Sequence, residues 1–81
     1  MSEFMSFKSV VERDEHIISH ADYFTTVRYR NRTYERQEHP NLAAAEQYAR
    51  RMIEAEPDAR FLVYAVQGNS SAWVKNIMRG S

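Results

Sequence analysis

The alternation of apolar and polar residues from Asp22 onward predicts a strand, a tight turn and a second strand. Over Tyr23–Tyr29 every second side chain is apolar or a threonine, which is the two-residue period of a strand with one apolar face. Asn31 follows this strand and tolerates a positive φ, so a two-residue turn at Asn31 and Arg32 predicts a β-hairpin.

The turn also predicts the register of this hairpin. With two residues in the turn, three cross-strand pairs follow: Arg30 with Thr33, Tyr29 with Tyr34, and Arg28 with Glu35. An aromatic pair then lies on one face of the hairpin and a pair of opposite charges lies on the other, so the register is self-consistent.

The chain changes to a helical period after Pro40. Apolar residues recur at spacings of three and four between Leu42 and Met52, and charged residues lie between them. Asn41 is a good N-cap and Pro57 cannot continue a helix, so the pattern predicts a helix over residues 41–56.

Two further strands follow this helix. Residues 60–66 are apolar on both alternations, which is typical of a central strand with both faces covered. Gly68 and Asn69 favour a turn within residues 67–71, and residues 72–77 then pair back as a fourth strand. In a regular strand, Trp73, Lys75 and Ile77 share one face.

The segment before the hairpin has two interpretations. Ser9 and Glu12 have the spacing of a capping box, and the apolar residues at 10, 11, 17 and 18 fall on one helical stripe, which predicts a helix over residues 9–20. The β-branched residues within 16–19 favour an early strand instead, and the sequence leaves this alternative open.

The expected fold class is α+β, with an antiparallel four-stranded sheet of order 2-1-3-4 and a β-β-α-β-β succession. The main helix packs on one face of the sheet, and a short N-terminal helix precedes the strands. Because the third strand is apolar on both alternations, the second face also needs a cover. The candidates are the N-terminal helix, a second copy of the chain and a foreign partner.

Length and composition fit one globular domain. The chain has 81 residues, two glycines, two prolines and 43% hydrophobic residues, and we expect a single domain over residues 5–78. Residues 1–4 and 79–81 resemble additions from a cloning vector, and we set them apart from the domain. A domain of this size removes only about 60% of its unfolded surface from water, so covering by a partner or by a second copy in a homodimer would stabilise it.

Charge and residue usage exclude several function classes. Eleven basic and eleven acidic side chains cancel, which disfavours a general nucleic-acid binder. The chain has no cysteine for disulfides or thiolate chemistry and no stretch with the length and hydropathy of a membrane span, so we expect a cytoplasmic protein. It also lacks a recognisable nucleophile triad and a glycine-rich phosphate loop, so we expect neither catalysis nor a cofactor.

A metal site on the N-terminal helix is a weaker hypothesis. Glu12, His16 and His20 would line one helix face at four-residue spacing, as metal ligands can. A structural zinc site needs four ligands and a catalytic site needs three, and the sequence supplies neither a cysteine nor an HExxH pattern. We therefore favour a polar helix face and expect no metal.

An arginine-rich hairpin supports one functional hypothesis, which is nucleic-acid binding. Guanidinium groups suit phosphate contacts and an aromatic ring suits base stacking. The residues concerned are Arg28, Arg30, Arg32, Tyr34 and Arg36. The alternative is a solvated hairpin in which the arginines pair with Glu35 and Glu38, and the net neutrality of the chain favours this interpretation.

Protein binding is the main functional hypothesis. It rests on the two-sided apolar third strand and on the large aromatic residue of the fourth strand, because tryptophan and tyrosine carry interface energy when they are exposed. The expected interface residues are Leu62, Tyr64, Val66, Trp73 and Lys75. Such a chain would act as a small non-enzymatic inhibitor, adaptor or regulatory subunit, roles common among small accessory proteins of phages and mobile elements. Its partner would be another protein or a second copy of itself.

Overall fold

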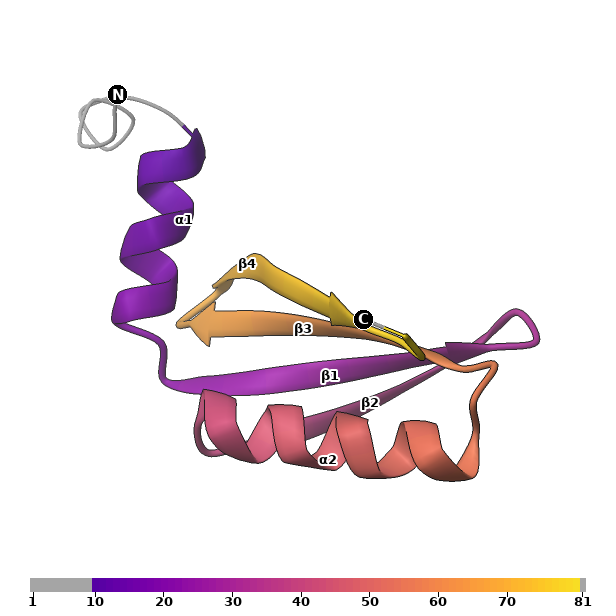
Figure 1. Cartoon of the computed structure of the whole chain (residues 1–81). Helices are drawn as coiled ribbons and strands as arrows, with labels where there is room; N and C mark the ends of the chain where they lie inside the picture. The colour runs from indigo at the N-terminus through magenta and orange to yellow at the C-terminus, as the bar shows by residue number, and fades with distance from the viewer. Residues whose placement is uncertain (1–9, 81) are drawn as a thin grey trace.

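The computed structural model describes residues 10–80, which form two helices and four strands (Figure 1). In chain order these are α1 (Val10–Ser19), β1 (Tyr23–Arg30), β2 (Thr33–His39), α2 (Leu42–Ala55), β3 (Arg60–Gln67) and β4 (Ser70–Ile77). The strands form one antiparallel sheet of order β2-β1-β3-β4, so the predicted α+β fold and strand order are confirmed. The cap predicted at Ser9 and the vector-like residues 1–4 and 81 lie outside the described residues.

The β1–β2 hairpin has the predicted turn and register. Asn31 and Arg32 adopt φ values of 54° and 65°, as both central residues of a type I′ turn must. The three predicted cross-strand pairs are present. The rings of Tyr29 and Tyr34 lie 4.7 Å apart, so their contact adds to the hairpin.

Helix α2 lies along one face of the sheet. Asn41 caps it, since its side chain accepts a hydrogen bond of 2.8 Å from the backbone N–H of Ala44. Ala45 and Ala49 are fully buried, and such small side chains let the helix axis approach the sheet closely. They pack with Phe61 and other apolar residues of β3 and β4 to form the larger part of the core.

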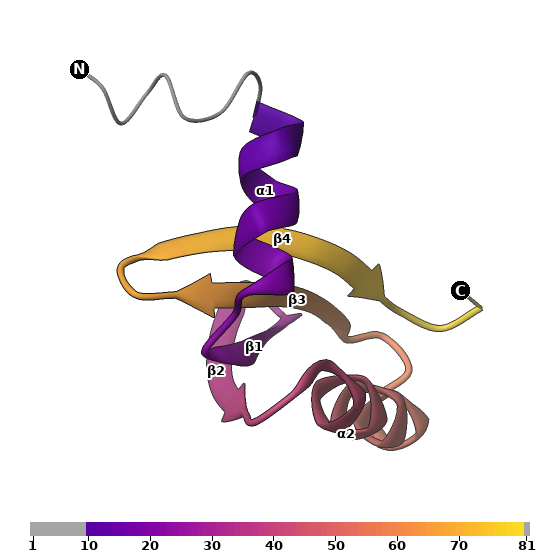
Figure 2. The ribbon, with the colours of Figure 1, turned by 90° about the vertical axis from the view of Figure 1, so that its left-hand side faces the viewer.

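Helix α1 packs on the same face as α2. Its buried residue Ile17 contacts Ala65 and Ala72. Ala65 alternates in phase with Phe61 on β3, which belongs to the α2 side of the sheet. The segment is therefore a helix and not an early strand, and it does not cover the second face. Its N-terminal turns extend past β4 (Figures 1 and 2).

A β-bulge in β4 corrects one prediction. The register changes between Val63, which pairs with Lys75, and Tyr64, which pairs with Trp73, so Val74 is the extra residue. An inserted residue reverses the alternation of side chains, a change that a period-two pattern does not reveal. Trp73 therefore points away from the helices, whereas Lys75 points toward them, and the prediction that Trp73, Lys75 and Ile77 share a face is wrong.

Both helices are short. Within residues 10–80, no helix has the length and hydropathy needed to cross a membrane.

Candidate functional site

The sheet face opposite the two helices carries the candidate site, and we call it the open face. No described helix packs on it. The strand registers place the following residues there: Tyr23, Thr25, Val27 and Tyr29 of β1, Tyr34, Arg36 and Glu38 of β2, Arg60, Leu62, Tyr64 and Val66 of β3, and Ser71, Trp73 and Asn76 of β4.

The open face carries a pair of neighbouring aromatic side chains, Tyr64 on the central strand β3 and Trp73 on the edge strand β4. Trp73 is 52% exposed and lies beside Tyr64, which is half-buried, on the neighbouring strand. The indole N–H of Trp73 donates a hydrogen bond of 2.8 Å to the side-chain oxygen of Asn76, which orients the ring. An exposed aromatic side chain that is already ordered loses little conformational entropy on binding, so it suits an interface.

A shallow depression of about 290 Å³ lies across this face. It is lined by Thr25, Val27, Arg36, Tyr64, Val66 and Ser71, so all four strands contribute to it. Hydroxyl groups and one guanidinium group surround an apolar floor, which suits an apolar side chain with a polar or anionic end.

The predicted interface residues are brought together with one exception. Leu62, Tyr64, Val66 and Trp73 all lie on the open face, although Val66 is only 7% exposed. Lys75 does not, because the bulge turns it toward α2, where its Nζ atom lies 2.6 Å from Glu46 Oε2. Sequence reasoning missed the contribution of β1 and β2, although the alternation in Tyr23–Tyr29 already indicated an apolar face.

Two opposite charges on β2 belong to the open face as well. Arg36 pairs in register with Val27, and Glu38 pairs with Thr25. Both side chains are exposed, and within residues 10–80 neither forms an ion pair or a side-chain hydrogen bond. Glu38 therefore does not pair with the hairpin arginines as the solvated-hairpin interpretation expected.

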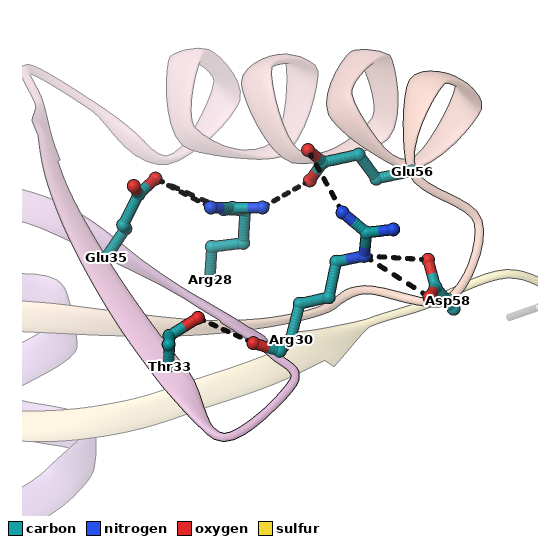
Figure 3. A network of polar contacts seen from close by, with 6 residues as sticks. All are labelled: Arg28, Arg30, Thr33, Glu35, Glu56 and Asp58. Carbon is teal, nitrogen blue, oxygen red and sulfur yellow. Dashed lines mark hydrogen bonds and ion pairs between the residues drawn. The ribbon is translucent and has the colours of Figure 1, made fainter.

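Arg28 and Arg30 are neutralised on the helix side of the sheet (Figure 3). The Arg28 side chain is 16% exposed and lies between Glu35 at 3.0 Å and Glu56 at 2.5 Å. Its hydrogen bond to Glu56 raises the pKa of Arg28 above the ordinary value for arginine. Arg30 pairs with Asp58 at 3.1 Å. Glu56 is the C-cap of α2, and the negative end of the helix dipole destabilises a carboxylate there. The ion pairs of Glu56 with Arg28 and Arg30 offset this unfavourable electrostatic energy.

The hairpin arginines therefore do not form one basic patch. Arg28 and Arg30 face the α2 side, Arg32 lies in the turn, and Arg36 lies on the open face. Tyr34 is 68% exposed and contacts Tyr29 on the open face. The residues proposed for nucleic-acid contact are thus divided between two faces, and two of the four cations are paired with carboxylates.

His39 is a buried residue at the end of β2. It is 8% exposed, its Nε2 atom lies 3.0 Å from Thr26 Oγ1, and its ring lies 5.0 Å from that of Tyr48. Burial lowers the pKa of His39 below its ordinary value. These contacts join the end of β2 to α2, so the role of His39 is structural.

The histidines of α1 do not assemble a metal site. The rings of His16 and His20 stack with centroids 4.3 Å apart, and Nδ1 of His20 lies 3.0 Å from the carbonyl oxygen of His16. Among the described residues, no group of three or more His, Asp or Glu side chains is arranged to hold a metal ion.

Comparison with known proteins adds no further constraint. No family model, no curated protein and no solved structure matches this chain. Function must therefore be argued from the surface of the fold itself.

Proposed function

We propose that this chain is a small non-enzymatic protein-binding module and that the open face is its binding surface. Inhibitor, adaptor and regulatory subunit are the roles that such a module can fill. The observation that carries the proposal is the exposure of Trp73, beside Tyr64, on a sheet face that no described helix covers.

The arrangement of the open face supports this proposal. Leu62 and Tyr64 are half-buried on the central strand β3, and on the edge strand β4 Trp73 lies between the polar residues Ser71 and Asn76. An apolar centre with a polar rim is the usual anatomy of a protein interface, because the rim excludes water from the contacts that carry the energy. The adjoining depression offers a place for a partner side chain.

The proposal can be tested by truncating Trp73 while leaving the fold intact. Trp73→Ala should weaken the complex with the bound protein about thirtyfold or more, as truncation of an interface hot spot does. Affinity capture with the tagged chain followed by titration with the identified partner gives this ratio, and urea unfolding of the same variant reports whether the domain remains folded.

Val11→Ala is a matched control. Val11 is 66% exposed but lies on α1, so its truncation removes exposed apolar area away from the open face. Binding should be unchanged in this variant. The proposal is wrong if folded Trp73→Ala binds the partner as tightly as the unaltered chain, or if the unaltered chain binds no protein, itself included.

Nucleic-acid binding remains the rival hypothesis and makes a different prediction. With Arg28 and Arg30 paired to acids, Arg32 and Arg36 are the hairpin cations left for phosphates, and Tyr34 is left for stacking. Phosphate contacts make affinity fall steeply with salt. Retention of single- or double-stranded nucleic acid in a low-salt gel shift, lost in Arg32→Ala, would favour this rival over the protein-binding proposal.

A further inference from the structure

We propose that the partner on the open face is a second copy of this chain, in a twofold dimer whose two sheets pack face to face. This inference rests on the proposed function, because it names the occupant of the same surface. Three features of the open face support it: its size, the position of its charges and the position of its apolar residues.

The open face has the dimensions of a dimer interface. Four strands that are spaced about 4.8 Å apart and have seven or eight residues at about 3.3 Å each cover roughly 20 by 25 Å. This is a flat footprint of roughly 500 Å², and the side chains that stand on it raise its accessible area toward the roughly 800 Å² per partner of a standard interface. Two twisted sheets that pack in this way lie about 10 Å apart, with their side chains interdigitated.

The two opposite charges that β2 carries on the open face are placed as a twofold contact requires. Gln37, Thr26, Val63 and Lys75 are cross-strand neighbours, and they form a row across the middle of the sheet. On β2, Arg36 stands one residue to one side of this row and Glu38 stands one residue to the other, and both point to the open face. The two charges are therefore equal, opposite and equidistant from the row.

A twofold interface makes the same patch meet itself after a half-turn. When the axis lies over the middle row, perpendicular to the strands, Arg36 of each copy comes to lie over Glu38 of the other copy. Neither residue has an ion-pair partner within residues 10–80, so both are available for this pairing. Two symmetric ion pairs then form on the β2 side of the dimer.

The same axis matches the apolar residues. Leu62 and Tyr64 flank Val63 on β3, so Leu62 of each copy lies against Tyr64 of the other. An aliphatic side chain against an aromatic ring is a favourable contact, whereas no bulky side chain is required to meet its own image at the centre. A foreign partner could use the apolar centre, but it would not require opposite charges placed symmetrically about the middle row.

Charge reversal tests this geometry directly. Arg36→Glu places two acids on β2 and Glu38→Arg places two bases there, so each single variant repels its own copy twice. We expect the unaltered chain to sediment at twice its mass of 9.6 kDa, and each single variant to show a dissociation constant raised at least tenfold. The double variant Arg36→Glu, Glu38→Arg should dimerise again, and an equimolar mixture of the two single variants should form a heterodimer.

Arg51→Glu is the matched control. It makes the same change of charge at an exposed position of α2, away from the open face, and should leave the dimer intact. Formation of the heterodimer in the mixture also shows that the single variants are folded.

The inference is overturned if the unaltered chain is monomeric at high micromolar concentration, if the single variants dimerise normally, or if the double variant and the mixture both fail to associate. These failures are distinguishable from failure of the proposed function. A monomeric chain that captures another protein through Trp73 refutes the dimer and upholds protein binding. A monomeric chain that captures nothing refutes both.

Discussion

Truncation of Phe61 should lower the free energy of unfolding much more than truncation of its neighbour Leu62 on β3. Phe61 is fully buried among the α2 side chains and makes an edge-to-face contact with Tyr48 at 6.1 Å, whereas Leu62 is half-buried on the open face. Substituting each by alanine therefore compares the two faces of one strand at almost the same position in the sheet.

The magnitudes follow from burial. Phe61→Ala leaves a closed cavity and should lower the free energy of unfolding by about 3–5 kcal/mol. A domain of this length has about 4–12 kcal/mol in total, so this variant approaches global unfolding. Full burial of a leucine is worth about 1.5–3 kcal/mol, and Leu62 is only half-buried beside solvent, so Leu62→Ala should cost roughly 1 kcal/mol in the monomer.

Urea unfolding followed by circular dichroism measures both values. Each substitution is made in an Arg36→Glu background, so that self-association does not add to the stability of either variant. The urea midpoint should fall roughly three times as far for Phe61→Ala as for Leu62→Ala, with an unchanged slope. Equal losses, or a larger loss for Leu62→Ala, would show that the assignment of the two faces is wrong.

Three local features lead to further predictions. Arg32→Gly should stabilise the hairpin by about 0.5–1 kcal/mol, because Arg32 holds a φ of 65°, and a lower thermal midpoint would contradict this. Asn41→Ala should cost about 1 kcal/mol through loss of the α2 cap and should speed amide exchange at Ala44, whereas an unchanged exchange rate would show that the cap is not formed. Burial lowers the pKa of His39 in the folded state, so the unfolded chain binds a proton first as the pH falls below about 6.5. The free energy of unfolding should therefore be highest above pH about 6.5. It should decline by up to about 1.4 kcal/mol per pH unit as the pH falls toward the pKa of His39 in the folded state. Urea titrations at several pH values should show a weaker loss of stability with falling pH in His39→Gln than in the unaltered chain. Equal losses would refute the assignment of this pH dependence to His39.

Local patterns along the chain predicted the elements of this fold. The switch from a two-residue to a helical period, the turn at Asn31 and Arg32, and the cap at Asn41 act over a few residues, so they can be read without tertiary contacts. Strand order followed as well, because one crossover helix and short hairpins leave few ways to connect four strands.

The faces on which side chains lie depended on tertiary structure. The bulge at Val74 separates Trp73 from Lys75, and the pairing of β3 with β4, not the composition of β4, sets its position. Likewise, an amphipathic N-terminal helix can pack on either face of a sheet, and it is the contact of Ile17 with Ala65 and Ala72 that places α1 beside α2.

The charges show the same division between local and tertiary information. Sequence proximity grouped Arg28, Arg30 and Arg36 on one hairpin, but strand alternation separates Arg36 from the other two. Glu56 and Asp58 are distant in sequence and reach the hairpin only because the end of α2 returns to it. The sequence by itself determined which elements form and how the hairpin pairs. The hairpin register placed Arg36 on the opposite face from Arg28 and Arg30. Long-range packing decided which of these two faces stayed open, because those contacts join residues that no local pattern relates.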